Sequence, residues 1–271
     1  MMSQCCTVRR RSRGFTMVEL SLTITVLGLL TPPAQRTVAQ YMLWQPATMD
    51  VDAAFTSLSG LDKNGNSGAL DGNDGCAGTG LPALPGVAVP NGLYSGHTNP
   101  INGNPDNTPS YIGTPGAFGT AKDAVHVDWA GIVAGTAITP NVVLPGGSWP
   151  GAAQMNNWPV IFANGNLSLN GGTTDSKGIL IVTGNLTMGG SFHHDGIVLV
   201  GGTRTSNGNN QIQGAVITGL NVKLGQSVGQ TAIGNGNKTF QYNSCNISSA
   251  LGALGSLQPV RNGWTDDYPS Y

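Results

Sequence analysis

The sequence is short of charge. Charged residues make up 9% of its 271 residues, against roughly 25% in an ordinary soluble domain, and glutamate occurs once, as Glu19. So few charges argue against a mostly helical body, whose outer faces need solvation. The 41 glycines and many Asn, Ser and Thr residues favour turns and strands. We expect a β-rich body, since the 39% of hydrophobic residues recur with an order that a disordered low-complexity chain lacks.

Basic charge is scarcer still after the N-terminus. Four of the 12 basic residues lie before Gly14, and a chain that begins at Phe15 has 8 basic and 13 acidic side chains, a formal charge of −5. That balance argues against a broad basic surface for nucleic acid. GxSxG, P-loop and CxxC signatures are missing as well. We therefore predict no catalytic residue, no metal site, no cofactor and no enzymatic activity.

Cysteine occurs four times, and Cys5 and Cys6 belong to the N-terminal leader. Cys76 and Cys245 remain, far apart in the sequence. Two thiols in an exported chain can form one disulfide. The sequence leaves two interpretations open, a Cys76–Cys245 disulfide or two unrelated buried thiols.

The N-terminus joins a cationic leader, residues 1–14, to an apolar run from Phe15 to Leu30. This order is typical of secretory signal peptides. However, no small-x-small cleavage site follows the run, which is also shorter than a membrane span of about 20 residues. Gly14 stands at the junction, Phe15 follows it, and Glu19 is the fifth residue after it.

The stretch RGFTMVEL closely resembles the cleavage motif of type IV prepilins and type II secretion pseudopilins, and the resemblance covers the leader and the apolar run. It implies that a prepilin peptidase cuts after Gly14 and methylates the new terminus, Phe15. It also implies a bacterial protein that is anchored in the inner membrane before assembly. The subunit would then pack against other pilin subunits in a periplasmic or cell-surface filament.

Glu19 has a physical reason to lie in this apolar run. A carboxylate in hydrocarbon is costly unless it finds a partner. The N-terminal amine of a neighbouring subunit is such a partner in a packed fibre, and this is the role that the resemblance implies for Glu19. The alternative is a chance acid in an ordinary signal peptide.

Pro32 and Pro33 depart from the family pattern, in which the first helix usually runs on. Proline disfavours helix in the residue before it. We predict an N-terminal membrane or filament helix over residues 15–45 that kinks or stops near Leu30 and resumes over about 34–44.

Residues 46–158 show little periodicity and are dense in turn-forming residues, which predicts an irregular region of β-strands and loops. Its DGNDG segment places Asp71, Asn73 and Asp74 at the alternate spacing of an oxygen-rich calcium loop. No bidentate glutamate follows, so a surface turn is the interpretation that we prefer.

Residues 159–243 contain a repeat. Its four segments begin at Val160, Gly178, Gly196 and Gly214, at equal intervals of about 18 residues, and a period of this length is typical of solenoids. Aligned apolar positions form columns that we expect to make one continuous interior. The columns are Ile161, Ile179, Ile197 and Ala215; Ala163, Ile181, Leu199 and Ile217; Leu186, Val222 and Phe240; and Met188, Leu224 and Tyr242. Leu167 and Leu169 fit the last two columns, respectively, with a one-residue slip. We predict a β-solenoid of about 18-residue rungs with glycines at its corners.

The third repeat breaks the columns. Arg204 and Ser206 stand where Leu186 and Met188 stand in the second repeat. Because burial of an unpaired arginine is prohibitive, we expect this strand to bulge outward.

Residues 244–271 begin with a helical pattern, because four apolar residues share one face. These are Ile247, Ala250, Leu251 and Leu254. We predict a short C-terminal helix that caps the open end of the stack, followed by a tail.

Polar candidates for chemistry are few. His193 and His194 face opposite ways on a strand, so we interpret them, with Asp195, as a polar corner. Asp175 lies near the corresponding corner of the preceding rung, which leaves a carboxylate pair for sugar cleavage open. Four asparagines begin N-x-S/T sequons, and we interpret them as turn and ladder residues. These are Asn166, Asn185, Asn237 and Asn246.

Taken together, the sequence predicts a mainly β protein with a pilin-like N-terminal helix, a β-solenoid and a short C-terminal helix. The leading functional hypothesis is a minor pilin or pseudopilin whose head serves surface display, adhesion or DNA capture, with no ligand specified. The alternatives are a carbohydrate-active β-helix enzyme of the envelope and a secreted adhesin. Three or more of six residues converging in a groove would favour the enzyme. The six are Asp175, His193, His194, Asp195, Arg204 and Lys223.

Overall fold

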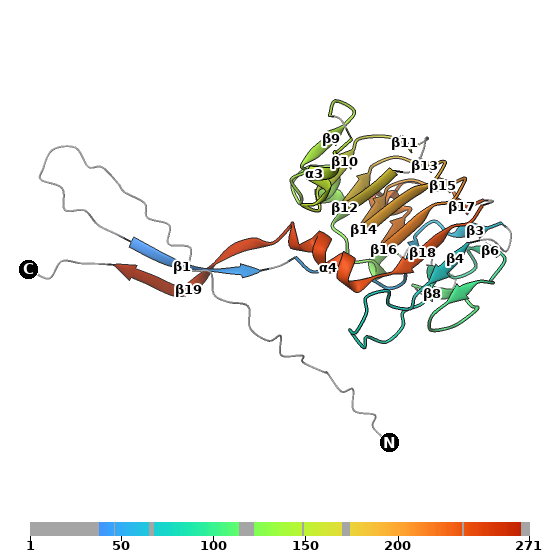
Figure 1. Cartoon of the computed structure of the whole chain (residues 1–271), viewed down its shortest axis with the longest axis horizontal. Coiled ribbons are helices and arrows are strands. Elements are labelled where there is room, and N and C mark those ends of the chain that lie inside the picture. Colours follow the sequence, from blue (N-terminus) through green and yellow to red (C-terminus); the bar gives the residue numbers. More distant parts are fainter. Residues whose placement is uncertain are drawn as a thin grey trace, which may run out of the picture. The chain divides into compact units, whose positions relative to one another are not determined.

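The protein is mainly β, with parallel sheets and few helices, as predicted (Figure 1). The described part falls into two compact units, the strand pair β1–β19 and residues 47–254. The computed structural model describes residues 38–45, 47–64, 68–113, 122–147, 149–169, 174–234 and 236–266.

The first unit pairs β1 (Val38–Gln45) with β19 (Ser256–Asp266) in antiparallel fashion. The prediction of helix is therefore wrong over residues 38–45, where β-branched and aromatic residues favour a strand and β19 satisfies the backbone. The predicted C-terminal tail is likewise largely a strand. Gly14, Phe15 and Glu19, with the first part of the predicted helix, lie outside the described residues. Among the helices that are described, none has the length and apolarity needed to cross a membrane.

The second unit contains a large and a small parallel sheet. In the large sheet, neighbouring strands follow the order β7 (Ile101–Asn102), β4 (Ala69–Asp71), β18 (Thr239–Tyr242), β16 (Gln211–Thr218), β14 (Phe192–Val200), β12 (Thr174–Val182), β10 (Val160–Ala163) and β9 (Val142–Leu144). Beside β16 this sheet also continues through β2 (Phe55–Ser57), β5 (Val87–Pro90) and β8 (Ser110–Ile112). The order in the small sheet is β11 (Leu167–Leu169), β13 (Leu186–Met188), β15 (Arg204–Ser206), β17 (Thr231–Ile233), β3 (Leu61–Lys63) and β6 (Tyr94–Gly96).

The sequence repeat sets the register of the central strands. Gly178 of β12 pairs with Gly196 of β14, and Gly196 pairs with Gly214 of β16. All three have positive φ angles of 104°, 126° and 151°, a conformation that favours glycine. The same backbone position thus requires glycine in three successive strands.

The first repeat is shifted by one residue relative to the predicted columns. Ile161 pairs with Leu180 rather than with Ile179. The slip predicted for the second strand is confirmed, because Leu167 pairs with Leu186. The two shifts agree, so both strands of the first repeat are displaced by the same one residue relative to the second repeat.

Two predicted columns are wrong after the third repeat. Val222 and Leu224 lie in a 3-10 helix, η1 (Leu220–Leu224), which lies between left-handed Gly219 and Gly225. Because this inserted turn lengthens the connection, β15 pairs with β17 instead. Phe240 and Tyr242, the last members of these columns, belong to β18 of the large sheet.

The apolar residues of the large sheet build two cores instead of the single predicted interior. Leu180 and Val198 point into the core between the two sheets, with Leu186 of the small sheet. Ile179 and Ile181, with the members of their predicted columns in the later repeats, face a second core on the other side of the large sheet. Ile161 and Ala163, which are shifted by one residue, belong to the first core. Strands buried on both faces read as continuous apolar runs, which is why the two sets are hard to separate by sequence.

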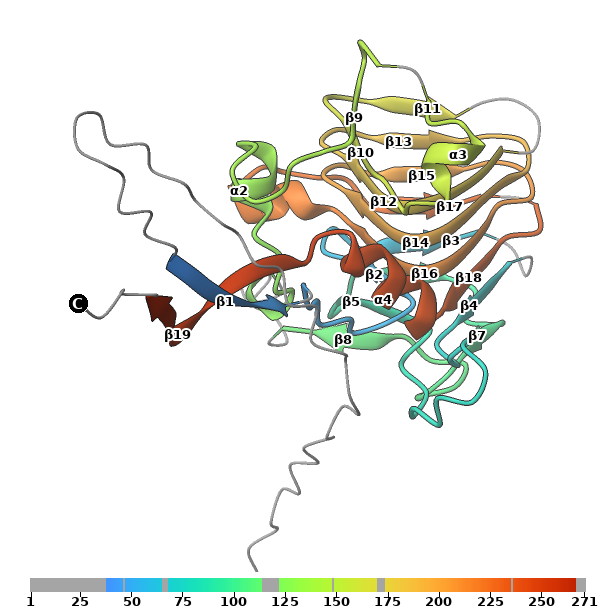
Figure 2. The ribbon, with the colours of Figure 1, turned by 60° about the vertical axis from the view of Figure 1, so that its left-hand side comes forward.

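Residues 55–112 extend both sheets, although their sequence shows no repeat. β2, β3 and β4 pair in parallel with β16, β17 and β18, respectively. Figure 2 shows these early strands beside the last strands of the repeat region. β2 therefore lies between the last long strand of the repeat, β16, and β5 of the early segment.

The predicted C-terminal helix is present as α4 (Ser244–Gly252), and the Asn243 side chain accepts a hydrogen bond from the backbone N–H of Asn246. Its buried residues Ile247 and Ala250 join the second core, to which α2 (Trp129–Val133) also contributes. The helix lies across β12, β14 and β16 (Figure 2). The prediction that it caps the end of the stack is wrong, because the apolar outer face of the large sheet requires a cover.

Candidate functional site

Four charged or titratable side chains gather on the outer face of β12 and β14. In the parallel register, Asp175 pairs with His193 and Lys177 pairs with Asp195. Residues two apart on a strand share a face, so these four side chains form one cluster. The strand repeat itself brings them together.

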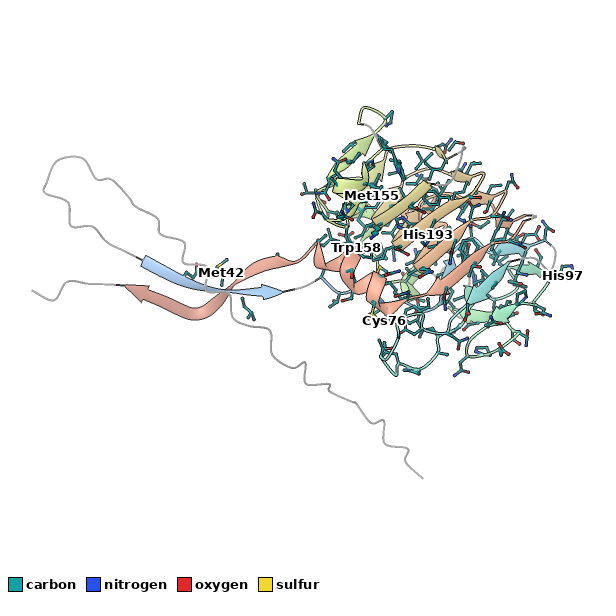
Figure 3. The ribbon with its side chains drawn as sticks, viewed as in Figure 1. Met42, Cys76, His97, Met155, Trp158 and His193 are labelled. Atoms are coloured by element: carbon teal, nitrogen blue, oxygen red, sulfur yellow. A yellow bond between two sulfur atoms is a disulfide. The ribbon has the colours of Figure 1, made fainter. Side chains whose placement is uncertain are left out.

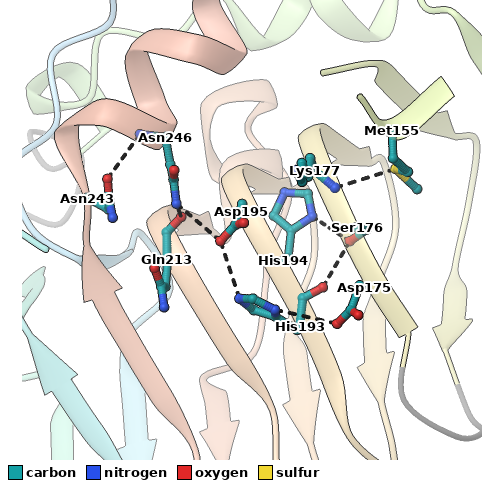
Figure 4. Close-up of polar contacts among 10 residues, drawn as sticks. All are labelled: Met155, Asp175, Ser176, Lys177, His193, His194, Asp195, Gln213, Asn243 and Asn246. Carbon is teal, nitrogen blue, oxygen red and sulfur yellow. Dashed lines mark hydrogen bonds and ion pairs between the residues drawn. The ribbon is translucent and has the colours of Figure 1, made fainter. Parts of the chain in front are cut away.

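His193 lies between the two carboxylates (Figure 4). Its Nδ1 is 3.5 Å from Oδ1 of Asp175, and its Nε2 is 3.3 Å from Oδ1 of Asp195. The side chain of Asp175 is 77% exposed, whereas those of His193 and Asp195 are 35% and 22% exposed. The Asp175 side of the cluster therefore lies in solvent, and the Asp195 side is largely buried.

The two inner groups perturb each other. Contact with the Asp195 carboxylate raises the pKa of His193, although burial of the ring opposes this change. Burial raises the pKa of Asp195, but the His193 imidazole outweighs burial and holds that pKa below its ordinary value. Near neutral pH these opposite shifts favour an ionised pair.

A groove, which is a cavity of about 530 Å³, lies beside the cluster. Its walls include Trp149, Met155 and Asn156, and the last two come from the end of α3 (Ala152–Met155) and the residue after it. Lys177 places its ammonium 5.8 Å from the ring centroid of Trp158, whose φ of 52° lies in the left-handed region. Figure 3 labels Met155, Trp158 and His193 on this part of the molecule. An apolar wall beside converging polar groups is typical of ligand pockets.

Helix α4 holds the inner side of the cluster. Nδ2 of Asn246 donates hydrogen bonds to Oδ1 of Asp195 and to the carbonyl oxygen of Gln213, both at 3.1 Å. The prediction that Asn246 is a turn or ladder residue is therefore wrong. Asn166 and Asn185 do form a ladder, in which each Oδ1 accepts a hydrogen bond at 2.8 Å from the backbone N–H of Asn185 and Thr203, respectively.

His194 faces away from the groove, as strand alternation predicts. It is fully buried, and its Nδ1 lies 2.8 Å from Oγ of Ser176. Burial lowers its pKa to about 4, so the ring is neutral at physiological pH. The His193–His194 pair does not act on one ligand.

Arg204 and Lys223 lie elsewhere. The predicted outward bulge at Arg204 is wrong, because Arg204 and Ser206 are both buried within the stack. Lys223 donates hydrogen bonds to the carbonyl oxygens of Lys122 and Val125. Three of the six residues named as a test of the enzyme hypothesis therefore converge, namely Asp175, His193 and Asp195.

Cys76 and Cys245 form a disulfide, with their Cα atoms 5.5 Å apart, within the usual range. Asp74 connects the same two segments, the loop that contains Cys76 and the start of α4. Its carboxylate accepts hydrogen bonds from the backbone N–H and the hydroxyl of Ser244, and from Cys76 and Thr79. The DGNDG segment is thus a hydrogen-bonded turn that is fastened to the start of α4.

Lys177 and the cavity wall were not predicted as site residues. Lys177 stands one repeat before Asp195, so the repeat contained a signal for their pairing. Trp149, Met155 and Trp158 precede the repeat, and no pattern in the sequence relates them to it. In the described ranges, no group of three or more His, Cys, Asp or Glu side chains is placed to hold a metal ion.

No protein-family model matches the chain, and searches of curated proteins and of solved structures give no match.

Proposed function

We propose that this chain is a prepilin-type filament subunit, of the minor pilin or pseudopilin kind, with a β-solenoid head. The observation that carries the proposal is the RGFTMVEL motif, in which Gly14, Phe15 and Glu19 stand in the register of a prepilin cleavage site. The cationic leader would remain on the cytoplasmic side of the inner membrane. After cleavage, the subunit would leave the membrane for a periplasmic or cell-surface filament.

The head is consistent with export and display. The Cys76–Cys245 disulfide suits an oxidising compartment outside the cytoplasm. We propose that the parallel strands form the rungs of a solenoid, with Gly178, Gly196 and Gly214 in register inside successive strands. Such a stack is a rigid support for a binding surface at a distance from the membrane.

The anchor that we propose is shorter than a long pilin helix. Because residues 38–45 form a strand, a helix that starts at Phe15 has to end before Val38. Pro32 and Pro33 are natural places for that end. Contacts between subunits would then be confined to the first apolar segment, around Glu19.

Mass spectrometry of the mature protein tests the proposal. The full chain is produced in a bacterium that has a prepilin peptidase, and we expect a terminus at N-methylated Phe15. The Gly14→Val variant should retain its leader, because a bulky residue replaces the glycine before the cut. Glu19→Ala should be cleaved but excluded from fibres. A terminus beyond Leu30, or unchanged fibre incorporation of Glu19→Ala, would rule out this function.

The groove favours a second candidate function, a carbohydrate-active head. Asp175 and Asp195 are diagonal neighbours, which places their Cα atoms about 8 Å apart for strands about 4.8 Å apart and a rise of about 3.3 Å per residue. Inverting glycosidases separate their two carboxyl groups by about 6.5–9.5 Å. His193 occupies the space between them, so a substrate or water would have to displace its ring.

Release of reducing ends from soluble polysaccharides tests this second candidate. Activity that falls at least 100-fold in Asp175→Asn and Asp195→Asn, of the order expected when an acid or base is lost, would support it. Asp62→Asn, on the small sheet, is the matched control and should keep the activity. No release by the wild-type chain would leave the groove as a binding surface of a filament subunit.

A further inference from the structure

The interior of the stack holds basic side chains. Residues 47–254 contain six Lys and Arg side chains, and Lys63, Arg204 and Lys238 are 0%, 0% and 1% exposed. Over the described ranges, the buried polar side chains include no Asp or Glu. Long basic side chains are rarely buried to this degree. Such side chains need partners inside the protein.

Arg204 is the group with the poorest compensation. It projects from β15 into the core, where its guanidinium carbon lies 4.3 Å from the ring centroid of Phe240. Nε and Nη2 contact the Sδ atom of Met188 at 3.3 and 3.2 Å. Nη1 is buried and has no hydrogen-bond acceptor among the described residues. A thioether is a weak acceptor without charge, and an aromatic face recovers only part of the hydration energy of a cation.

A second cation lies near Arg204. The Lys238 ammonium donates a hydrogen bond to the carbonyl oxygen of Gly234 at 2.7 Å. Burial lowers the pKa of Lys238, and the positive charge of Arg204 lowers it further. Burial also lowers the pKa of Arg204, to about 9, which still leaves the guanidinium protonated at neutral pH. The guanidinium of Arg204 thus carries its positive charge under physiological conditions.

We infer that a small monovalent anion of the chloride class binds in the core beside Nη1 of Arg204. An isolated buried cation is unfavourable, and a counter-charge beside it offsets much of that cost. The free donor identifies the side on which the anion lies. Met188 and Phe240 fill the surroundings with apolar groups, which suits a weakly hydrated monovalent ion. A phosphate or other polyanion needs several more donors.

Thermal unfolding of the full chain tests the inference, with sodium chloride compared with sodium gluconate at constant ionic strength. A ligand that binds only the folded state stabilises it in proportion to the logarithm of its concentration. In the wild-type protein we expect Tm to rise by about 3–5 °C for each tenfold increase in chloride above its Kd. Arg204→Met should lose this response. Lys223→Met removes a cation bound to surface carbonyls and should keep it.

Equal effects of the two salts, or an undiminished chloride response in Arg204→Met, would overturn the inference. If Arg204→Met does not fold, crystals of the wild-type protein soaked in bromide decide the matter. An anomalous peak within hydrogen-bond distance of Nη1 supports the site, and a core without such a peak rejects it. Both measurements are independent of prepilin cleavage, so the filament proposal and this site can fail separately.

Discussion

At the scale of single residues, two adjacent histidines have opposite electrostatic environments. His193 lies on the outer face between two carboxylates, and contact with Asp195 raises its pKa. His194 points into the core, and burial lowers its pKa to about 4. Strand alternation explains the difference. The two rings should therefore make the stability of the head depend on pH in opposite directions.

Stability should pass through a maximum near pH 6.5, the ordinary pKa of histidine. Below that pH the unfolded chain protonates His194 while the folded chain does not. The contribution of His194 is therefore lost as the pH falls toward 4, by on the order of 3 kcal/mol. The contribution of His193 is present at low pH and is lost as the pH rises through its raised pKa. Urea unfolding between pH 4.5 and 8 measures both limbs.

Single substitutions assign the two limbs of that curve. His194→Asn should flatten the acid limb, and His193→Gln should flatten the alkaline limb. The pKa of Asp74 is low, because hydrogen bonds from Ser244 outweigh the effect of burial. Carboxylates of this kind lose their contribution to stability only at still lower pH. An unchanged acid limb in His194→Asn would mean that other groups control it.

Arg204 shows how far energetic reasoning from a sequence can go. The repeat correctly aligned Arg204 with Leu186, and the two residues do pair. The inference that the strand would bulge failed because the backbone ladder fixes the direction of the side chain. An aromatic ring and a methionine sulfur then surround the guanidinium. Alignment with the repeat predicted its position better than the cost of burying its charge did.

At the scale of elements, the row of glycines inside β12, β14 and β16 is closely packed: Gly178, Gly196 and Gly214 pair with one another in the sheet. A Cβ atom at Gly196 would lie 2.2 Å from the carbonyl oxygen of Gly178, and the φ of 126° is unfavourable for other residues. We expect Gly196→Ala to lower the free energy of unfolding by more than about 2 kcal/mol, through strain together with a steric clash.

Gly92→Ala is the matched control for this prediction. Gly92 also has a positive φ, of 80°, but nothing lies within 4 Å of the added Cβ. This variant should show the cost of backbone strain alone, about 1 kcal/mol. Urea unfolding of the two variants gives both values. Equal losses would show that close packing between successive strands adds nothing at Gly196.

The strands that repeat were predictable, and their connections were not. The period of the repeat identifies the neighbours β12, β14 and β16, because their apolar and glycine positions recur in order. η1 follows Gly219 and disturbs the period, so Val222 and Phe240 were assigned to strands that do not pair. The helical face of α4 was evident from Ile247 and Ala250. Its partner was not, since apolar periodicity identifies a buried face without saying what covers it.

At the scale of the whole molecule, strands that are far apart in the sequence pair within both parallel sheets. β2, β3 and β4 pair with β16, β17 and β18, which come much later in the chain. A repeat cannot predict such a contact, because the early strands lack the period of the later ones. The groove has the same origin in part, since Trp149 and Met155 come from outside the repeat and Asn246 from beyond its end. Only the cluster of Asp175, Lys177, His193 and Asp195 was implied by the repeat itself.

The disulfide connects two of these distant segments, and its removal should lower the stability of the head. Cys76 and Cys245 are 169 residues apart and connect the loop after β4 to the first turn of α4. A bridge across so long a loop restricts the unfolded chain strongly and stabilises proteins by about 2–5 kcal/mol. Urea unfolding with and without dithiothreitol should show a loss of this size in the wild-type chain. The Cys76→Ser, Cys245→Ser double variant should be equally weakened and insensitive to the reductant. A wild-type chain that dithiothreitol does not destabilise would show that pairing with β18, together with the bonds from Asp74 to Ser244, holds the two segments without the bridge.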